Sequence, residues 1–332
     1  MNSIIPAPVA RQPWQMLIPL FVLVAFGTTV LYSVAGLEFS TYAQSHILRF
    51  VVFLVMAFVI AHMPRAFVAA AAFPAYAGVL VLLALVEALG AIGGGSQRWL
   101  QLGPIVLQPS EFMKPVIVLV LARFYDSLPI AMTQSWRALI PAAGLMVLPF
   151  GLVLMQPDLG TGLAIVFGGA VVIFLAGLPL WWFMSAGAAA MVAAPLAFFF
   201  VLHDYQRQRV LTFLDPESDP LGTGYHITQS KIAIGSGGLF GKGFGNGSQS
   251  HLNYLPEPHT DFVFATMSEE WGLIGGLVVI ICFALILRWG RDVARQAQDR
   301  FGSLLASGMV ATIFFYMAIN LSMVMGLSLI HI

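Results

Sequence analysis

The sequence predicts an all-α, polytopic integral membrane protein with nine transmembrane helices and one large extracytoplasmic loop over residues 203–261. Two observations predict this class. Charged residues make up only 9% of the 332 residues, whereas apolar residues reach 59%. A soluble domain typically has about 25% charged residues, so this chain lacks the charge for a water-facing surface. In addition, apolar segments long enough to cross about 30 Å of hydrocarbon as helices recur along the chain.

Nine segments are the candidate spans, and the chain 1–332 is predicted to form a single membrane domain around them. They lie near residues 16–35, 46–63, 68–90, 112–128, 138–155, 161–179, 181–202, 262–288 and 302–327. The first could be a signal peptide, because Arg11 precedes it and Ser33, Val34 and Ala35 resemble a cleavage site. Its length and the many spans that follow favour an uncleaved helix.

The orientation in the membrane follows from Lys and Arg in the short loops. With the N-terminus in the cytoplasm, eight of these residues fall on the cytoplasmic side and seven on the other, four of them in the long 203–261 loop. Long loops contribute little to the positive-inside rule, so the remaining bias is eight to three. The sequence therefore predicts a cytoplasmic N-terminus and an extracytoplasmic long loop.

Several classes of function are disfavoured by composition and spacing. Fifteen Lys and Arg balance fifteen Asp and Glu, so no basic excess points to a nucleic-acid partner. The one cysteine, Cys282, excludes a disulfide framework and a cysteine metal site. The glycines of the long loop do not form a phosphate loop, because Lys242 is followed by Gly243 rather than Ser or Thr. His259 and Asp261 lack the two-histidine spacing of a zinc protease.

Ionisable side chains gather on the predicted outer side. Ionisable residues near hydrocarbon are costly, so each suggests a function. A one-sided cluster suits an amphiphilic substrate whose anionic head is held by Lys and Arg while a carboxylate transfers a proton. The alternative is that these charges pair with one another and attach loops to helices. The residues concerned are Glu87, Arg98, Glu111, Lys114, Asp158, Asp204, Arg207, Arg209, Lys231, Lys242, Glu257 and Asp261, with Glu269 and Glu270 deeper in the eighth span.

Local spacing suggests a plain structural role for some of these residues. Ser110 can cap the helix that follows, and Glu111 suits the positive end of its dipole. Lys114 lies three residues further on the same helix face, which indicates a buried ion pair or a substrate contact. Asp158 and Asp261 each precede an apolar run and could also be helix caps.

With these motifs, the sequence resembles the SEDS family (shape, elongation, division and sporulation) of polytopic membrane glycosyltransferases over nearly its whole length. Residues 249–254 look more like the elongation branch of that family than the division branch. The resemblance rests on Arg98 and Trp99; on Gln108, Pro109, Ser110, Glu111 and Lys114; on residues 156–161; and on Leu255, Pro256, Glu257, His259, Thr260, Asp261, Phe262, Glu269 and Glu270.

The resemblance implies a peptidoglycan glycosyltransferase that polymerises lipid II at the outer face of the bacterial cytoplasmic (inner) membrane during cell elongation. Asp261 matches the proposed catalytic aspartate and would act as general base on the acceptor hydroxyl. That hydroxyl attacks the donor anomeric carbon and displaces undecaprenyl diphosphate with inversion. No cofactor is certain, although Mg²⁺ or Mn²⁺ could assist. The substrate-binding candidates are Arg98, Glu111, Lys114, Asp158, Arg207, Arg209, Lys231, Lys242, Glu257 and His259.

The resemblance also implies partners, and it leaves alternatives. The partners would be lipid II, the nascent glycan strand, a class B penicillin-binding protein as transpeptidase and other elongation-complex proteins. The alternatives are a flippase for the same precursor and a scaffold that catalyses no reaction. The charges on one side of the membrane and the lack of paired repeats favour the enzyme. The family continues beyond Leu327 to a tenth span. We therefore expect a truncated or frame-shifted chain in which Ser328 to Ile332 are not native.

Overall fold

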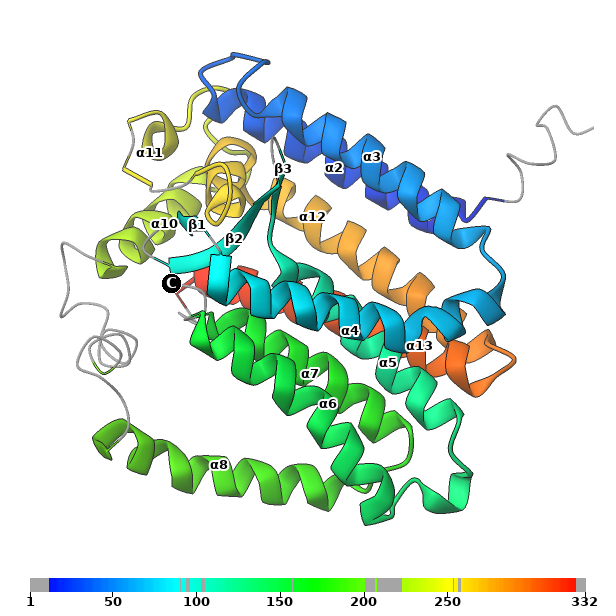
Figure 1. Cartoon of the computed structure of the whole chain (residues 1–332). Coiled ribbons are helices and arrows are strands. Elements are labelled where there is room, and N and C mark those ends of the chain that lie inside the picture. Colours follow the sequence, from blue (N-terminus) through cyan, green and yellow to red (C-terminus); the bar gives the residue numbers. More distant parts are fainter. Residues whose placement is uncertain are drawn as a thin grey trace, which may run out of the picture. The chain divides into compact units, whose positions relative to one another are not determined.

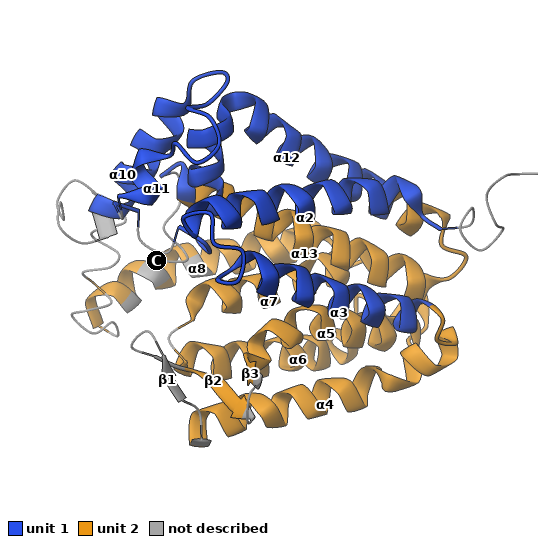
Figure 2. Cartoon of the chain, turned by 90° about the horizontal axis from the view of Figure 1, so that it is seen from above, with its two compact units in different colours: residues 1–61, 225–290, 324–326 blue, residues 62–224, 291–323, 327–332 orange. Residues whose placement is uncertain are grey.

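The computed structural model describes residues 12–89, 91–93, 96–102, 105–156, 158–200, 207, 223–252, 254–255 and 258–326 (Figure 1). Predictions that concern Asp204, Arg209, Glu257 and residues 328–332 lie outside these residues. Figure 2 colours the two compact units of the chain. Unit 1 comprises Met1–Ala61, Tyr225–Gly290 and Val324–Gly326, and unit 2 comprises His62–Gly224, Arg291–Met323 and Leu327–Ile332.

One helix corresponds to each of the nine predicted spans. Among the described residues, seven of these helices are long and apolar enough to cross a membrane, which confirms an all-α polytopic membrane protein. The other two are α7, with 17 residues, and α5, which carries charges near both ends. The count of nine spans stays a prediction. The helices are α2 (Trp14–Val34), α3 (Ala43–Ala61), α4 (Arg65–Leu89), α5 (Pro109–Asp126), α6 (Trp136–Met155), α7 (Leu159–Leu175), α8 (Leu180–Phe200), α12 (Val263–Gln296) and α13 (Arg300–Val324).

The predicted long loop contains helical segments that we expected to be irregular. Helix α10 (Thr223–Gly237) and the single turn α11 (Ser248–His251) both lie in it. Ile227, Ser230 and Ala233 are buried at helical spacing along α10, and Ser230 Oγ donates a hydrogen bond to the carbonyl oxygen of Val324 (2.7 Å). The many glycines and polar residues of this loop masked the helical periodicity.

A small antiparallel sheet follows α4, and the sequence did not predict it. Its order is β1 (Ala91–Gly93), β2 (Ser96–Leu102) and β3 (Ile105–Leu107). Ala91 pairs with Trp99, and Leu100 pairs with Leu107. The strands are too short for a clear alternating pattern, but β2 sets the position of Arg98 beside α4 and α5.

Helix α5 is the centre of the unit 2 core. The α5 residues of this core recur every four positions and are fully buried. Because this face is buried, the middle of α5 is entirely apolar although both ends carry charges. Burial of such side chains contributes roughly 1.5–3 kcal/mol each. The core comprises Met113, Ile117, Leu121 and Tyr125 of α5 with Leu83 of α4, Ile165 and Val172 of α7, and Phe301 and Leu304 of α13.

Gly308 of α13 allows this helix to approach α5 and α7 closely. A Cβ at this position would lie 2.5 Å from Val118 Cγ1 and 2.7 Å from Val172 Cγ2. Small residues permit such approach between membrane helices. We expect Gly308→Ala to destabilise the protein by about 1–3 kcal/mol, despite the higher helix propensity of alanine. The test is a thermal-unfolding comparison in detergent with Gly144→Ala, because a Cβ at position 144 would meet no atom of the described residues within 4 Å. Equal midpoints for the two variants would contradict the prediction.

In unit 1, helix α12 is interrupted at Gly272, and residues of the long loop form backbone hydrogen bonds on both sides of the interruption. Gly272 has φ 62° and ψ −156°, a conformation that a residue with a Cβ rarely adopts. The carbonyl oxygens of Glu269 and Glu270 accept hydrogen bonds from the backbone of Lys242 (2.9 Å) and Gly243 (3.0 Å). On the other side of the interruption, the N–H groups of residues 273 and 274 donate to the carbonyls of residues 238 (2.9 Å) and 239 (3.3 Å).

Candidate functional site

The start of α5 brings together two predicted site residues. Lys114 Nζ lies 2.6 Å from Glu111 Oε2, so the ion pair that their spacing predicts is present. The Lys114 side chain is 7% exposed and that of Glu111 is 52% exposed. Lys114 Nζ also lies 3.9 Å from the ring centroid of Tyr316 on α13. A buried ammonium is stabilised by such a ring face as well as by its carboxylate partner.

The prediction that Ser110 caps α5 is wrong. The helix begins at Pro109, with Gln108 at the N-cap position and Ser110 inside the first turn. Proline is favoured at the first helical position because its missing N–H is not needed there. The Ser110 Oγ is buried and has no hydrogen-bond partner among the described residues.

Asp158 lies at the N-cap of α7, as its position before an apolar run suggested. Its Oδ1 accepts a hydrogen bond from the backbone N–H of Thr161 (3.2 Å), so the cap is confirmed. Gln108 Nε2 lies 3.4 Å from Asp158 Oδ2, which connects this turn to the start of α5.

Arg98 of β2 is tied to the turn between α6 and α7. Its Nε donates to the carbonyl oxygen of Gln156 (3.0 Å), and the buried Gln156 donates through Nε2 to the carbonyl of Leu83 (3.3 Å). Unit 2 thus gathers Arg98, Glu111, Lys114 and Asp158 around the ends of neighbouring helices. The two glutamines were part of the motifs, but their positioning role was not predicted.

Two other predicted cations have plain structural surroundings. Arg207 donates through Nε and Nη2 to the carbonyl oxygens of Phe198 and Phe199 (both 2.8 Å), which satisfies orphan carbonyls at the end of α8. Lys231 is an exposed residue of α10, and its aliphatic part packs against Gly326.

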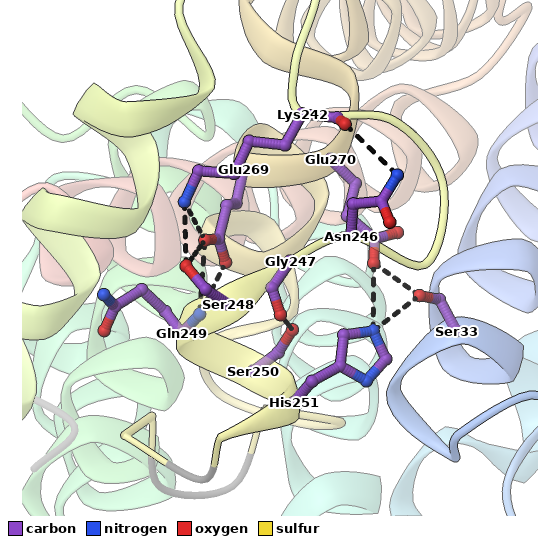
Figure 3. Close-up of polar contacts among 10 residues, drawn as sticks. All are labelled: Ser33, Lys242, Asn246, Gly247, Ser248, Gln249, Ser250, His251, Glu269 and Glu270. Carbon is purple, nitrogen blue, oxygen red and sulfur yellow. Dashed lines mark hydrogen bonds and ion pairs between the residues drawn. The ribbon is translucent and has the colours of Figure 1, made fainter.

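Lys242, another predicted cation of the long loop, pairs with a buried glutamate (Figure 3). Its Nζ lies 2.5 Å from Glu269 Oε1 and 2.9 Å from Ser248 Oγ. The Ser248 hydroxyl donates to the same carboxylate (3.0 Å), as does the backbone N–H of Gln249 (3.2 Å). Lys242 therefore fits the alternative in which charged residues pair with one another and attach loops to helices.

The neighbouring Glu270 has a separate set of partners. Ser33 of α2 donates its hydroxyl to Glu270 Oε1, and His251 Nε2 lies 3.5 Å from the same oxygen. Ser33 Oγ and His251 Nε2 are 3.4 Å apart. The sequence assigned no catalytic or binding role to Ser33, Ser248 or His251. The available signal was the pair of adjacent acids inside an apolar span, which requires buried partners.

Asp261 is an exposed residue in the turn that leads into α12. The next residue, Phe262, is buried and its carbonyl accepts from the N–H of Thr266 (3.1 Å). His259 stacks on Tyr42 with ring centroids 4.2 Å apart and an interplanar angle of 12°. The turn is therefore anchored on both sides of Asp261.

The predicted site residues are divided between the two units. Unit 1 holds Asp261, His259, Lys231 and Lys242, and unit 2 holds Arg98, Glu111, Lys114, Asp158 and Arg207. Within the described ranges, no group of three or more His, Cys, Asp or Glu is arranged to hold a metal ion.

These features define a multi-pass membrane protein with a carboxylate in an exposed turn and partly buried cations at helix ends. The chain belongs to the FtsW, RodA and SpoVE family of cell cycle proteins, whose family model matches residues 13–329. This is the family that the sequence motifs indicated, and residues 249–254 indicated its elongation branch.

Two relatives illustrate the similarity in sequence. The peptidoglycan glycosyltransferase MrdB of Escherichia coli K12 is 43% identical over 316 residues, which cover 94% of this chain and 84% of the relative. The stage V sporulation protein E of Bacillus subtilis is 38% identical over 255 residues, covering 75% and 67%, respectively.

Two solved structures illustrate the similarity in fold. The rod shape determining protein RodA of Thermus thermophilus is 28% identical, with a TM-score of 0.70, and the match covers 96% of this chain and 87% of that one. A chain from a peptidoglycan synthase complex that coordinates polymerization and crosslinking is 30% identical, with a TM-score of 0.81, and the match covers 95% and 88%.

Proposed function

We propose that this protein is a peptidoglycan glycosyltransferase that polymerises lipid II into glycan strands at the outer face of the inner membrane during cell elongation. The observation that carries the proposal is the 43% identity to MrdB over 94% of the chain. The described residues agree with it, because unit 1 offers an exposed carboxylate beside a membrane helix and unit 2 offers a buried lysine in a polar group.

In the proposed mechanism, Asp261 is the catalytic general base. Its carboxylate accepts the proton of the acceptor sugar hydroxyl, whose oxygen attacks the anomeric carbon of the donor chain. The bond from that carbon to undecaprenyl diphosphate breaks, and a single displacement inverts the configuration. A base of this kind typically contributes 10²–10⁴-fold to the rate.

Basic residues would receive the charge that develops on the diphosphate. Lys114 and Arg98 are the strongest candidates among the described residues, because both lie in the polar group of unit 2. Preorganised cations in a water-poor site stabilise such charge more than they would in water. Glu111 and Asp158 would position this group, and Mg²⁺ or Mn²⁺ could assist. The other predicted substrate contacts stay candidates: Arg207, Arg209, Lys231, Lys242, Glu257 and His259.

The proposal includes an orientation and partners. The N-terminus would lie in the cytoplasm and the 203–261 loop outside, as the loop charges predict. A class B penicillin-binding protein would crosslink the new strands, together with other elongation-complex proteins. The similarity to a chain of a synthase complex that couples polymerization to crosslinking supports such a partner.

A single assay separates polymerisation from the alternatives. Purified full-length protein is given fluorescently labelled lipid II in liposomes, with transpeptidation blocked, and the products are resolved by gel electrophoresis. A ladder of glycan polymer is expected. Lipid II translocation without polymer would favour a flippase, and neither product in the presence of the partner would favour a scaffold.

A further inference from the structure

We propose that residues 237–248 form a re-entrant brace that fixes the first part of α12, residues 263–271, and thereby positions Asp261. This inference rests on the proposed function, because it assigns a role to residues that hold the proposed base. The name "brace" is used below for residues 237–248.

We place the tip of the brace well inside the predicted membrane span 262–288. It contacts α12 at Gly272, nine residues after the helix begins at Val263. At 1.5 Å per residue this is about 14 Å along the helix. If the span begins near residue 262, as the sequence predicts, this is close to half of the roughly 30 Å hydrocarbon thickness. Leu239 and Phe240 are 61% and 78% exposed, as expected for a tip that faces lipid rather than water.

Backbone pairing explains how an irregular segment is tolerated at this depth. Non-helical backbone in a membrane must have its polar groups satisfied by protein. Four hydrogen bonds join the brace to the two sides of the Gly272 interruption. A Cβ on Gly272 would overlap the backbone of Leu239 and Gly241, so the fit requires glycine at this position.

Two glutamates add side-chain ties on the same stretch of α12. Glu269 binds Lys242, Ser248 and the backbone N–H of Gln249, all from the brace or the residue after it. Glu270 binds Ser33 of α2 and contacts His251 just beyond the brace, as Figure 3 shows. Both carboxylates are buried, so removing a partner is costly.

Asp261 lies at the other end of the short helical segment that these ties fix. Residues 263–271 make about two and a half helical turns, and the turn that holds Asp261 precedes them directly. Stacking of His259 on Tyr42 ties that turn to the start of α3. A segment fixed at both ends keeps its carboxylate in one place, and a displacement of 1 Å can reduce the rate about 10²-fold.

The first test measures kinetics with Glu269→Ala, Glu269→Gln and the control Arg291→Gln. Arg291 forms an exposed ion pair with Asp292 on the same helix. We expect Glu269→Ala to reduce kcat about 10²-fold with little change in KM for lipid II. Glu269→Gln should retain more activity, because an amide oxygen still accepts from Gln249 and Ser248, and the control should match the wild type.

Other outcomes of these kinetics would overturn the inference. If Glu269→Ala had the same kcat as the control, the brace would not position Asp261. A higher KM with unchanged kcat would instead assign Glu269 to substrate binding. If the wild type itself makes no polymer, the proposed function fails, and the second test still decides whether the brace enters the membrane.

The second test measures depth and does not depend on activity or on mutation of Glu269. Phe240→Cys and the control Leu252→Cys are made in a Cys282→Ala background, labelled with bimane and reconstituted in vesicles. We expect nitroxide lipids with the spin label deep in the acyl chain to quench position 240 more than position 252, and aqueous iodide to do the reverse. Equal iodide quenching at both positions would refute a re-entrant brace.

Discussion

Asp261→Asn should abolish the formation of glycan polymer from lipid II while the protein remains folded. The amide has the size of the carboxylate but cannot accept the proton of the acceptor hydroxyl, so a loss of about 10²–10⁴-fold is expected. Because Asp261 is exposed, the substitution should cost little stability, as is usual at surface positions. The measurement is the initial rate of polymer formation, with thermal unfolding as a check on folding.

Asp292→Asn is the matched control, since Asp292 is a partly exposed aspartate of α12 that pairs with Arg291. It should have the wild-type rate. Equal polymer from Asp261→Asn and the wild type would remove Asp261 as the base. If neither the variant nor the wild type makes polymer but both still translocate lipid II, transport would be favoured instead.

Lys114→Glu should reduce polymer formation by at least about 10²-fold and lower the unfolding temperature. The new carboxylate would be buried next to Glu111, and loss of one partner from a buried pair costs about 3–5 kcal/mol. We expect the double variant Glu111→Lys with Lys114→Glu to recover stability but not activity, because its cation would lie at the exposed position. Rates and unfolding midpoints of both variants provide the test.

The second ion pair of α5 is the matched control. Arg123 Nη1 and Asp126 Oδ2 are 3.1 Å apart with the same three-residue spacing, at the other end of the helix. Arg123→Glu, alone or exchanged with Asp126→Lys, should leave the rate near that of the wild type. Full recovery of activity by the exchanged Glu111 and Lys114 pair would show that Lys114 serves only to pair with Glu111.

The sequence was sufficient to predict the features that depend on neighbouring residues. Hydropathy located a helix at each predicted span, because a membrane-crossing helix must be apolar over its length. The ion pair of Glu111 and Lys114 and the cap at Asp158 follow from spacings of three residues. The cap at Ser110 failed because Pro109 begins the helix one residue earlier.

Features that depend on distant segments were not predictable in this way. Ser33 and Glu270 are 237 residues apart in the chain, and no local pattern connects them. The pairing of Lys242 with Glu269 was not predicted either, because the two residues lie 27 positions apart in the chain. The interruption at Gly272 could not be recognised either, since a glycine within a membrane span is common and most cause no break.

The order of segments along the chain bears on how the interrupted helix is made. Residues 237–243 leave the ribosome before residues 263–274, so their N–H and carbonyl groups are already available when this part of α12 emerges. An unpaired peptide group in hydrocarbon costs several kcal/mol, and each buried acid adds about 2.5–3.5 kcal/mol on translocon scales. Synthesis from the N-terminus therefore supplies the partners first, and a circular permutation that placed residues 223–254 after α12 would remove that advantage during biogenesis.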